Sequence, residues 1–263
     1  MGDDMRKYTY DNEVNILKSF RLMFEGALVF SEHKDVKEVV DSIIEESFWE
    51  KWINSSSKSD LPPDFYNKEK KYMMEVMMFD DKAKEDGSFH GTKKRESELL
   101  NELRDNEIEK LFPNLDGIMI LGDSKLETDK DHNFMRYKGN FKRVIKKHSE
   151  KATSYHENHP GYELIFFVFD ESSGIYFKNP NSHSLDEGTQ ILAKPHLYWI
   201  DKDFIQVIKN SRADYLIWYK PYNSFNTIQG IVDDFPKVMI YKVDDLDIDT
   251  IEYDEKIMES NEI

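Results

Sequence analysis

Residues 163–170 of this chain, ELIFFVFD, form a run that is apolar at every position between two acidic ends. A strand with one face in solvent alternates apolar and polar residues, whereas a strand covered on both faces is apolar nearly throughout. The run therefore predicts a central strand that needs packed elements on both sides. Three further segments of similar composition, 72–79, 214–220 and 237–245, are also predicted to be strands.

Helical periodicity, with apolar residues recurring every three or four positions, appears in five other segments. They are 11–31, 34–54, 93–111, 131–157 and 201–211, the last with Asp201 as its N-cap. The alternation of helix and strand in the second half of the chain predicts an α/β or α+β fold. We expect a central mixed sheet flanked by helices, with the first 55 residues forming a helical hairpin packed on it.

The negative charge of the chain is concentrated near its C-terminus. There are 36 Lys and Arg residues against 52 Asp and Glu residues, which gives a net charge of −16. Residues 243–263 carry half of that charge, with nine acids and one base. We therefore divide the chain into a single α/β domain, residues 1–242, and an acidic C-terminal segment, residues 243–263. This segment is either a solvated tail or a cover for a basic surface.

The predicted helix 131–157 has the opposite charge. Between positions 136 and 151 it contains seven bases and one acid. Five of these bases lie in two adjacent rows outside the apolar stripe and are candidates to bind nucleic-acid phosphates: Lys138, Lys142, Arg143, Lys146 and Lys147. The alternative is a solvated helix face, which is the usual role of a charged run.

Several classes of protein are excluded by what the chain lacks. Without cysteine it has no disulfide, no Cys-ligated zinc or iron–sulfur site and no thiol nucleophile. It has no run of about 18 apolar residues, so we expect no transmembrane helix and no membrane partner. The N-terminal sequence MGDDMRKYTYDNEV has no apolar signal-peptide stretch, and we therefore expect a cytoplasmic location.

Two acidic residues form the candidate site. Asp64 begins a short strand that we expect to pair in a hairpin with strand 72–79. Glu75 lies in the middle of strand 72–79, where a carboxylate is costly unless something pairs with it. Two carboxylates on neighbouring strands could bind Mg²⁺, which activates water and stabilises charge on a phosphate. Glu46, one turn before Glu50 on the preceding helix, is the candidate third ligand.

This arrangement resembles the PD-(D/E)XK nuclease superfamily, which has the restriction-endonuclease-like fold. The matching residues are Pro63-Asp64 and then Glu75-Val76-Met77 on the next strand. The resemblance extends over residues 34–220 in the order of the elements. It implies a metal-dependent nuclease in which Asp64 and Glu75 are catalytic and bind Mg²⁺. The whole chain also resembles prophage-type bacterial proteins.

The sequence departs from that family at one position. The family has a lysine two residues after the second acid, where it helps to position or activate the attacking water, and this chain has Met77 there. An active enzyme would need a lysine from elsewhere, and Lys93 or Lys94 at the start of the next predicted helix is the first candidate. Other candidates are Lys125, Lys142 and Lys146.

A second functional hypothesis is a non-catalytic interaction module of the same fold, which binds a protein or a nucleic acid. Met77 and the acidic net charge favour it. A structural alternative to the candidate site is that residues 63–66 are only a loop that enters a strand, while Glu75 faces solvent on an edge strand or pairs with Lys70 or Lys71.

Three histidines that lie close together in the sequence are candidates for a zinc site. His156 and His159 lie at the end of the predicted helix 131–157. His148 lies within the apolar stripe of that helix, and we interpret it as a satisfied core histidine.

Overall fold

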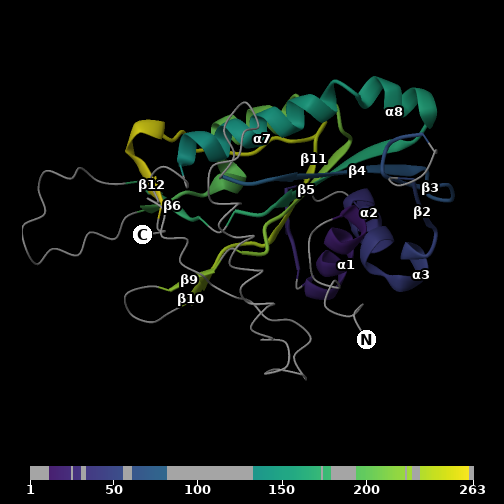
Figure 1. The fold of residues 1–263 in the computed structure, drawn as a ribbon, viewed down its shortest axis with the longest axis horizontal. Coiled ribbons are helices and arrows are strands. Elements are labelled where there is room, and N and C mark those ends of the chain that lie inside the picture. Colours follow the sequence, from purple (N-terminus) through teal and green to yellow (C-terminus); the bar gives the residue numbers. More distant parts are fainter. Residues whose placement is uncertain are drawn as a thin grey trace, which may run out of the picture.

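The computed structural model describes residues 12–24, 26–30, 34–55, 61–81, 133–172, 174–178, 194–222, 224–226 and 232–260. Its main element is a seven-stranded sheet (Figure 1). In sheet order the strands are β1 (Leu28–Val29), β11 (Val238–Lys242), β8 (Tyr215–Tyr219), β5 (Glu163–Asp170), β4 (Tyr72–Phe79), β3 (Phe65–Asn67) and β2 (Trp52–Asn54). Strands β4, β5 and β8 are parallel to one another. Antiparallel pairing joins β2 to β3, β3 to β4 and β8 to β11, so the sheet is mixed.

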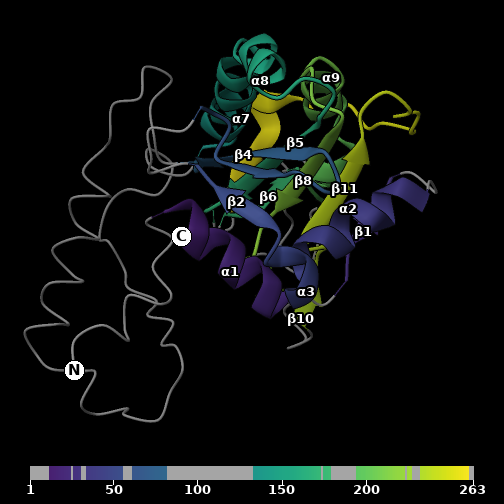
Figure 2. The ribbon, with the colours of Figure 1, turned by 90° about the vertical axis from the view of Figure 1, so that its right-hand side faces the viewer.

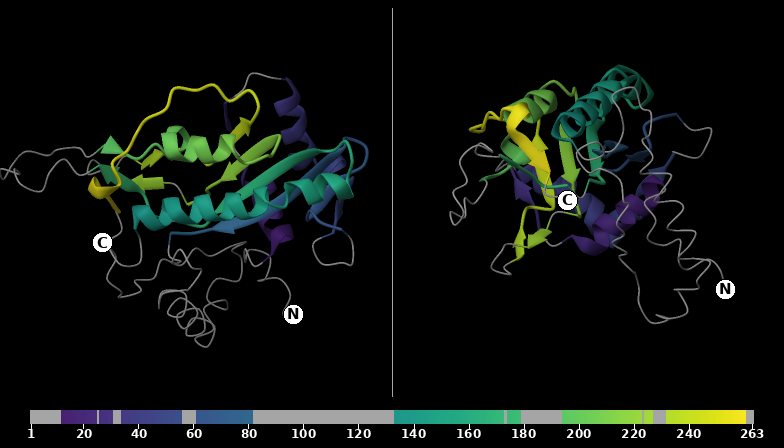
Figure 3. Two further views of the ribbon diagram at one scale, coloured as in Figure 1. Left: turned by 90° about the horizontal axis from the view of Figure 1, so that it is seen from above. Right: turned by 60° about the vertical axis from the view of Figure 1, so that its left-hand side comes forward.

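Helices cover both faces of this sheet (Figure 2). On one face lie α7 (Phe134–Ser149), α8 (Ala152–Asn158) and α9 (Lys202–Lys209), and on the other lie α1 (Glu13–Met23), α2 (Lys34–Ile44) and α3 (Glu46–Trp49). Seen from above, α7 and α9 run side by side over the strands (Figure 3). The prediction of an α/β fold with a mixed sheet flanked by helices is confirmed.

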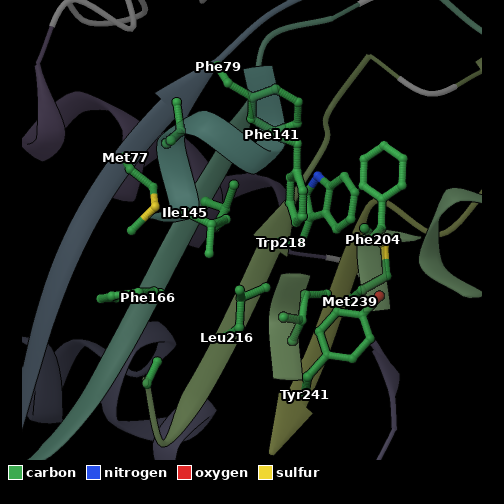
Figure 4. Packing of buried hydrophobic residues seen from close by; sticks show 14 of the residues in the cluster. Met77, Phe79, Phe141, Ile145, Phe166, Phe204, Leu216, Trp218, Met239 and Tyr241 are labelled. Carbon is green, nitrogen blue, oxygen red and sulfur yellow. The ribbon is translucent and has the colours of Figure 1, made fainter. Parts of the chain in front are cut away.

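The central strand β5 is buried on both faces, as its apolar sequence predicts. Residues 164–169 are fully buried, and they contribute alternately to two hydrophobic clusters. On the α7 face, Phe141, Phe204 and Trp218 stack above the strands (Figure 4). On the α1 face, Phe20 packs edge-on against Phe167. Burial of these large rings is the main source of stability in such a core.

The prediction of a helical hairpin over the first 55 residues is wrong at two places. Helix α1 ends at Met23, since Phe24 is already extended with a ψ of 108°, and Gly26 beyond it has a φ of +129°. The chain then adds the edge strand β1 next to β11. The second predicted helix, 34–54, ends early as well, and its last residues form strand β2, in which Trp52 is buried and donates its Nε1–H to the Ser42 carbonyl.

The other predicted elements in the described residues are close to their expected positions. Strand 72–79 matches β4, and its hairpin partner is β3. The helix predicted over 131–157 is divided by a break at Glu150 and Lys151 into α7 and α8. Helix α9 begins after Asp201, whose side chain accepts from the Asp203 N–H as an N-cap. The helix predicted over 93–111 lies outside the described residues.

Residues 243–260 pack against the domain. Val243, Leu246 and Met258 are buried in the cluster on the α7 face. The 3-10 turn η3 (Glu255–Ile257) leads into β12 (Met258–Ser260), which pairs with β6 (Tyr176–Lys178) and through it with β7 (Lys194–Pro195). The described residues also include the turn η2 (Tyr198–Ile200) and the hairpin of β9 (Ser224–Asn226) with β10 (Val232–Asp234). Of the two interpretations of the acidic segment, a solvated tail is therefore wrong for its described part.

Candidate functional site

The β3–β4 hairpin brings Asp64 and Glu75 next to each other. Phe65 pairs with Met74, so Asp64, one residue earlier, lies opposite Glu75. Residues opposite each other in an antiparallel pair point to the same face of the sheet. The Asp64 Oδ2 atom accepts the backbone N–H of Val76 at 2.9 Å, which fixes its carboxylate against β4. The two acids singled out in the sequence therefore converge.

Glu75 is paired with a histidine from the helix above it. Its Oε1 atom lies 2.7 Å from Nδ1 of His148 on α7, and the two side chains are 8% and 14% exposed. The expectation that Glu75 faces solvent or pairs with Lys70 or Lys71 is wrong, because Glu75 is buried and its carboxylate contacts His148. The interpretation of His148 as a satisfied histidine within the core stripe is confirmed.

Burial and like charge act together on Asp64. Burial raises the pKa of Asp64 to about 7, with a further increase from the charge of Glu75, although the Val76 N–H and the charge of Lys151 oppose the change. The pKa of Tyr155 on α8 is also raised, first by burial and then by the charge of Glu75. Carboxyls whose pKa is shifted by burial and by a neighbouring charge are common at functional sites, which makes this pair on the β3–β4 hairpin the candidate site.

Glu46 is not part of this site. It begins α3, on the face of the sheet opposite α7, and it is exposed and forms an ion pair with Arg21 of α1. The expectation of Glu46 as a third metal ligand is wrong, because helical periodicity shows which residues of a helix are buried but not which face of the sheet it covers. From the N-terminal helices, the charge of Glu13 on α1 makes a smaller contribution to the raised pKa of Asp64.

Met77, at the position where the PD-(D/E)XK superfamily has a lysine, is part of the core. Met77 is 2% exposed and packs in the cluster on the α7 face, where Figure 4 shows it beside Ile145. Lys93 and Lys94, the expected substitutes, lie outside the described residues, as does Lys125. Within the described residues, the cation that acts on Asp64 is Lys151 in the break between α7 and α8.

The carboxylates of Asp64 and Glu75 are enough for a divalent cation that is otherwise held by water, but not for a site with three carboxylates. Among the described residues no group of three or more His, Asp or Glu side chains is arranged to hold a metal. Asp64 uses Oδ2 for the Val76 N–H, and Glu75 uses Oε1 for His148. Mg²⁺ is commonly held by one or two carboxylates and keeps several water ligands. The residues present match that pattern and not a three-carboxylate site.

The cations of the basic helix α7 differ in whether they contact other described residues. Lys138 is partly buried between Asp203 of α9 and Glu255 of η3 and forms ion pairs with both. Arg143 donates to Asn140 at 3.2 Å. Lys142, Lys146 and Lys147 are exposed and make no ion pair within the part of the chain that the structure describes. We call these three lysines the basic face.

The structure also contains a buried ion pair that the sequence analysis did not identify. Asp170 ends β5 and Lys220 follows β8, and their charged atoms lie 3.4 Å apart with both side chains almost fully buried. The Asp170 carboxylate accepts from the Tyr137 hydroxyl at 2.7 Å and from the Trp218 indole at 3.2 Å. Lys220 donates to the Ser172 carbonyl at 2.8 Å. The sequence signal was a charged residue directly at the end of each apolar strand.

None of the helices in the described ranges is long and apolar enough to cross a bilayer. In comparisons of this chain with protein-family models, curated proteins and solved structures, no match was found.

Proposed function

We propose that this protein is a metal-dependent, nuclease-like phosphodiester hydrolase in which Asp64 and Glu75 bind Mg²⁺. The observation that carries the proposal is the convergence of these two carboxylates on the β3–β4 hairpin. The pKa of Asp64 is raised to about 7, first by burial and then by the charge of Glu75, so the ionised form of Asp64 is destabilised at this place. A divalent cation bound by the two carboxylates would stabilise that ionised form.

The order of the elements gives further support. A helical segment, a hairpin that carries the two acids, a helix, a strand, another helix and another strand follow one another along residues 34–219. This is the order that the resemblance to the PD-(D/E)XK superfamily implies. The restriction-endonuclease-like fold is the finer assignment that we propose within the mixed α/β architecture.

The proposed roles follow from position. A bound Mg²⁺ would supply an activated water and stabilise charge on the phosphate. His148 holds Glu75 by its Oε1 atom and would orient its carboxylate in the site. The basic face of Lys142, Lys146 and Lys147 lies on the helix that carries His148 and would bind the nucleic-acid backbone. Met77 is in the core and cannot serve as the family's lysine does. Among the described residues, Lys151 is the cation whose charge lowers the pKa of Asp64.

A cleavage assay tests this proposal. The protein is incubated with single- and double-stranded DNA and RNA in Mg²⁺ or Mn²⁺, and Asp64→Asn and Glu75→Gln are compared with the parent. We expect cleavage by the parent and a loss of at least about 100-fold in each variant. Glu46→Gln is the matched control and should keep full activity, because Glu46 lies on the other face of the sheet. Equal cleavage by Asp64→Asn and the parent would overturn the assignment.

A second candidate function is a non-catalytic module of the same fold that binds a nucleic acid or a protein. Two observations favour it. Met77 is buried where the family has a lysine, and Glu75 is covered by His148. The same assay separates the two, because such a module would bind nucleic acid in a gel-shift experiment without cleaving it in any divalent cation.

A further inference from the structure

Three aromatic rings lie together beside the candidate site. The centroid of the Tyr66 ring on β3 is 4.6 Å from that of His159, and the His159 ring is 5.4 Å from that of Tyr162. His159 and Tyr162 belong to the turn between α8 and β5, in which the Tyr162 N–H donates to the His159 carbonyl. Tyr66 and Tyr162 pack against the cluster on the α7 face, and all three side chains are partly exposed. We call these three side chains the aromatic platform.

The aromatic platform lies on the same face of the sheet as the two acids. Asp64 and Tyr66 are two positions apart in an extended segment, so their side chains point to the same side, about 7 Å apart along the strand. Opposite Tyr66 is Met73, which belongs to the cluster on the α7 face. At the end of α8, the Asn158 side chain donates to the Pro62 carbonyl at 2.8 Å, which holds the turn against the segment that leads into Asp64 (Figure 1). The platform therefore adjoins the candidate site.

Aromatic rings beside carboxylates suit a flat ligand group without charge. A nucleobase carries no net charge, so the acids do not repel it, and its π-face stacks on the rings of Tyr and His. Burial lowers the pKa of His159, so its imidazole is neutral at pH 7 and can stack in the same way. The phosphates of the same strand would be bound by the metal ion and by the basic face.

A lysine at the platform suits the backbone next to such a base. The Nζ atom of the exposed Lys68 lies 5.8 Å from the centroid of the Tyr66 ring. A cation over an exposed ring is held weakly, and a stacked base is held more strongly. A base on Tyr66 would therefore displace Lys68, whose ammonium group would then bind the adjacent phosphate.

We propose that the aromatic platform binds an unpaired nucleobase, so that the substrate of the candidate site is single-stranded nucleic acid. In a duplex the bases are paired and stacked on one another, and a base reaches a protein ring only when it is pulled out of the helix. This inference rests on the proposed function, since it assumes that a nucleic acid lies over Asp64 and Glu75. Stacking tolerates every base, so we expect little sequence preference.

Binding of short fluorescent oligonucleotides to the full chain tests the proposal, by anisotropy in Mg²⁺ and again in EDTA, where no metal-dependent cleavage occurs. The ligands are a single strand, an abasic strand with the same phosphates, and a duplex. We expect the parent to bind the normal single strand at least about fivefold more tightly than the abasic one. Tyr66→Leu keeps an apolar side chain and removes the ring, so it should bind the normal strand about fivefold more weakly and the abasic strand as the parent does. Tyr66→Phe keeps the ring and should bind as the parent does.

Phe48→Leu is the matched control. Phe48 is an exposed ring with Nζ of Lys70 at 5.7 Å from its centroid, but it lies on α3, on the other face of the sheet. Its removal should leave the binding of all three ligands unchanged.

The outcomes separate this inference from the proposed function. If the parent binds none of the three ligands in either condition, both fail. If the parent binds the normal and abasic strands equally well, or the duplex more tightly than the single strand, only this inference fails. Equal binding by Tyr66→Leu and the parent would also overturn it. If thermal unfolding shows that Tyr66→Leu does not fold, the comparison of the normal and abasic strands on the parent decides.

Discussion

The Nδ1 atom of His148 and the Oε1 atom of Glu75 lie 2.7 Å apart, although 73 positions separate the two residues in the chain. The contact joins the underside of α7 to the centre of β4. A carboxylate buried in an apolar strand is costly without a partner, and His148 is the partner. The pair thus stabilises the fold and also orients an acid of the candidate site.

Removal of the histidine should therefore destabilise the protein. We expect His148→Ala to lower the free energy of unfolding by about 3 kcal/mol, because Glu75 is left buried without a partner. His148→Asn keeps an N–H near the position of Nδ1 and should recover about half of that loss. Urea unfolding at neutral pH measures both. The partly exposed His156→Ala on α8 is the control, and an equal effect of His148→Ala and His156→Ala would contradict the role of the pair.

The raised pKa of Asp64 predicts an unusual pH dependence of stability. The pKa of this carboxyl is about 7 in the folded protein and 3.8 ordinarily, so between pH 4 and 7 the folded state binds more protons than the unfolded state. The free energy of unfolding should therefore fall as the pH rises through this window. Asp64→Asn should remove that part of the slope and be more stable than the parent at pH 8, by on the order of 2 kcal/mol.

Urea unfolding at pH 5 and pH 8 in the absence of divalent cations checks this expectation. The exposed Asp244→Asn is a control with the same change in charge. Added Mg²⁺ should raise the stability of the parent at pH 8 and have a smaller effect on Asp64→Asn. Parallel pH profiles of the parent and Asp64→Asn would show that Asp64 titrates as an ordinary surface acid.

The buried pair of Asp170 and Lys220 should be important for stability. Lys220→Met leaves Asp170 charged and fully buried, and Asp170→Asn leaves Lys220 in the same position, so each should cost about 3–5 kcal/mol. In the double variant neither charge is left alone, and its loss should be smaller than the sum of the two by at least about 1 kcal/mol. Chemical denaturation of the three variants measures this coupling. The exposed Lys209→Met should stay within about 0.5 kcal/mol of the parent.

The basic face should determine the salt dependence of nucleic-acid binding. Changing Lys142, Lys146 and Lys147 to Gln should lower the slope of log affinity against log salt by about 2–3 for duplex DNA. Lys138→Gln should have little effect, because Asp203 and Glu255 already neutralise that lysine. A triple variant at the exposed Lys18, Lys34 and Lys37, on the face of α1 and α2, is the control with equal charge. An unchanged slope in the first variant would show that the basic face is only solvated.

The acidic segment should weaken such binding through its contact with α7. Glu255→Gln removes one of the two partners of Lys138 and should strengthen nucleic-acid binding about two- to fivefold at low salt, less at high salt. Asp247→Asn, an exposed change in the same segment, is the control. Deletion of residues 243–263 would not test this idea, because Val243, Leu246 and Met258 belong to the core. Equal affinity of Glu255→Gln and the parent would contradict a covering role.

Local sequence patterns determined much of the architecture. The unbroken apolar run of β5 required cover on both faces, and both faces are covered. The Asp64–Glu75 hairpin and the Asp201 cap followed from strand length, proline position and side-chain chemistry, which act over a few residues. The acidic C-terminal segment and the basic helix are likewise visible in the sequence alone.

The tertiary structure alone decided the partners of these residues. Glu75 with His148, Asp170 with Lys220 and Lys138 with Glu255 are separated by many positions, and no period in the sequence relates them. Glu46 illustrates the same point, since an amphipathic pattern shows that a helix packs without showing which face of the sheet it packs on. Periodicity depends on local backbone geometry, whereas a contact between distant elements depends on how the whole chain is connected, which is why the site was only partly predictable.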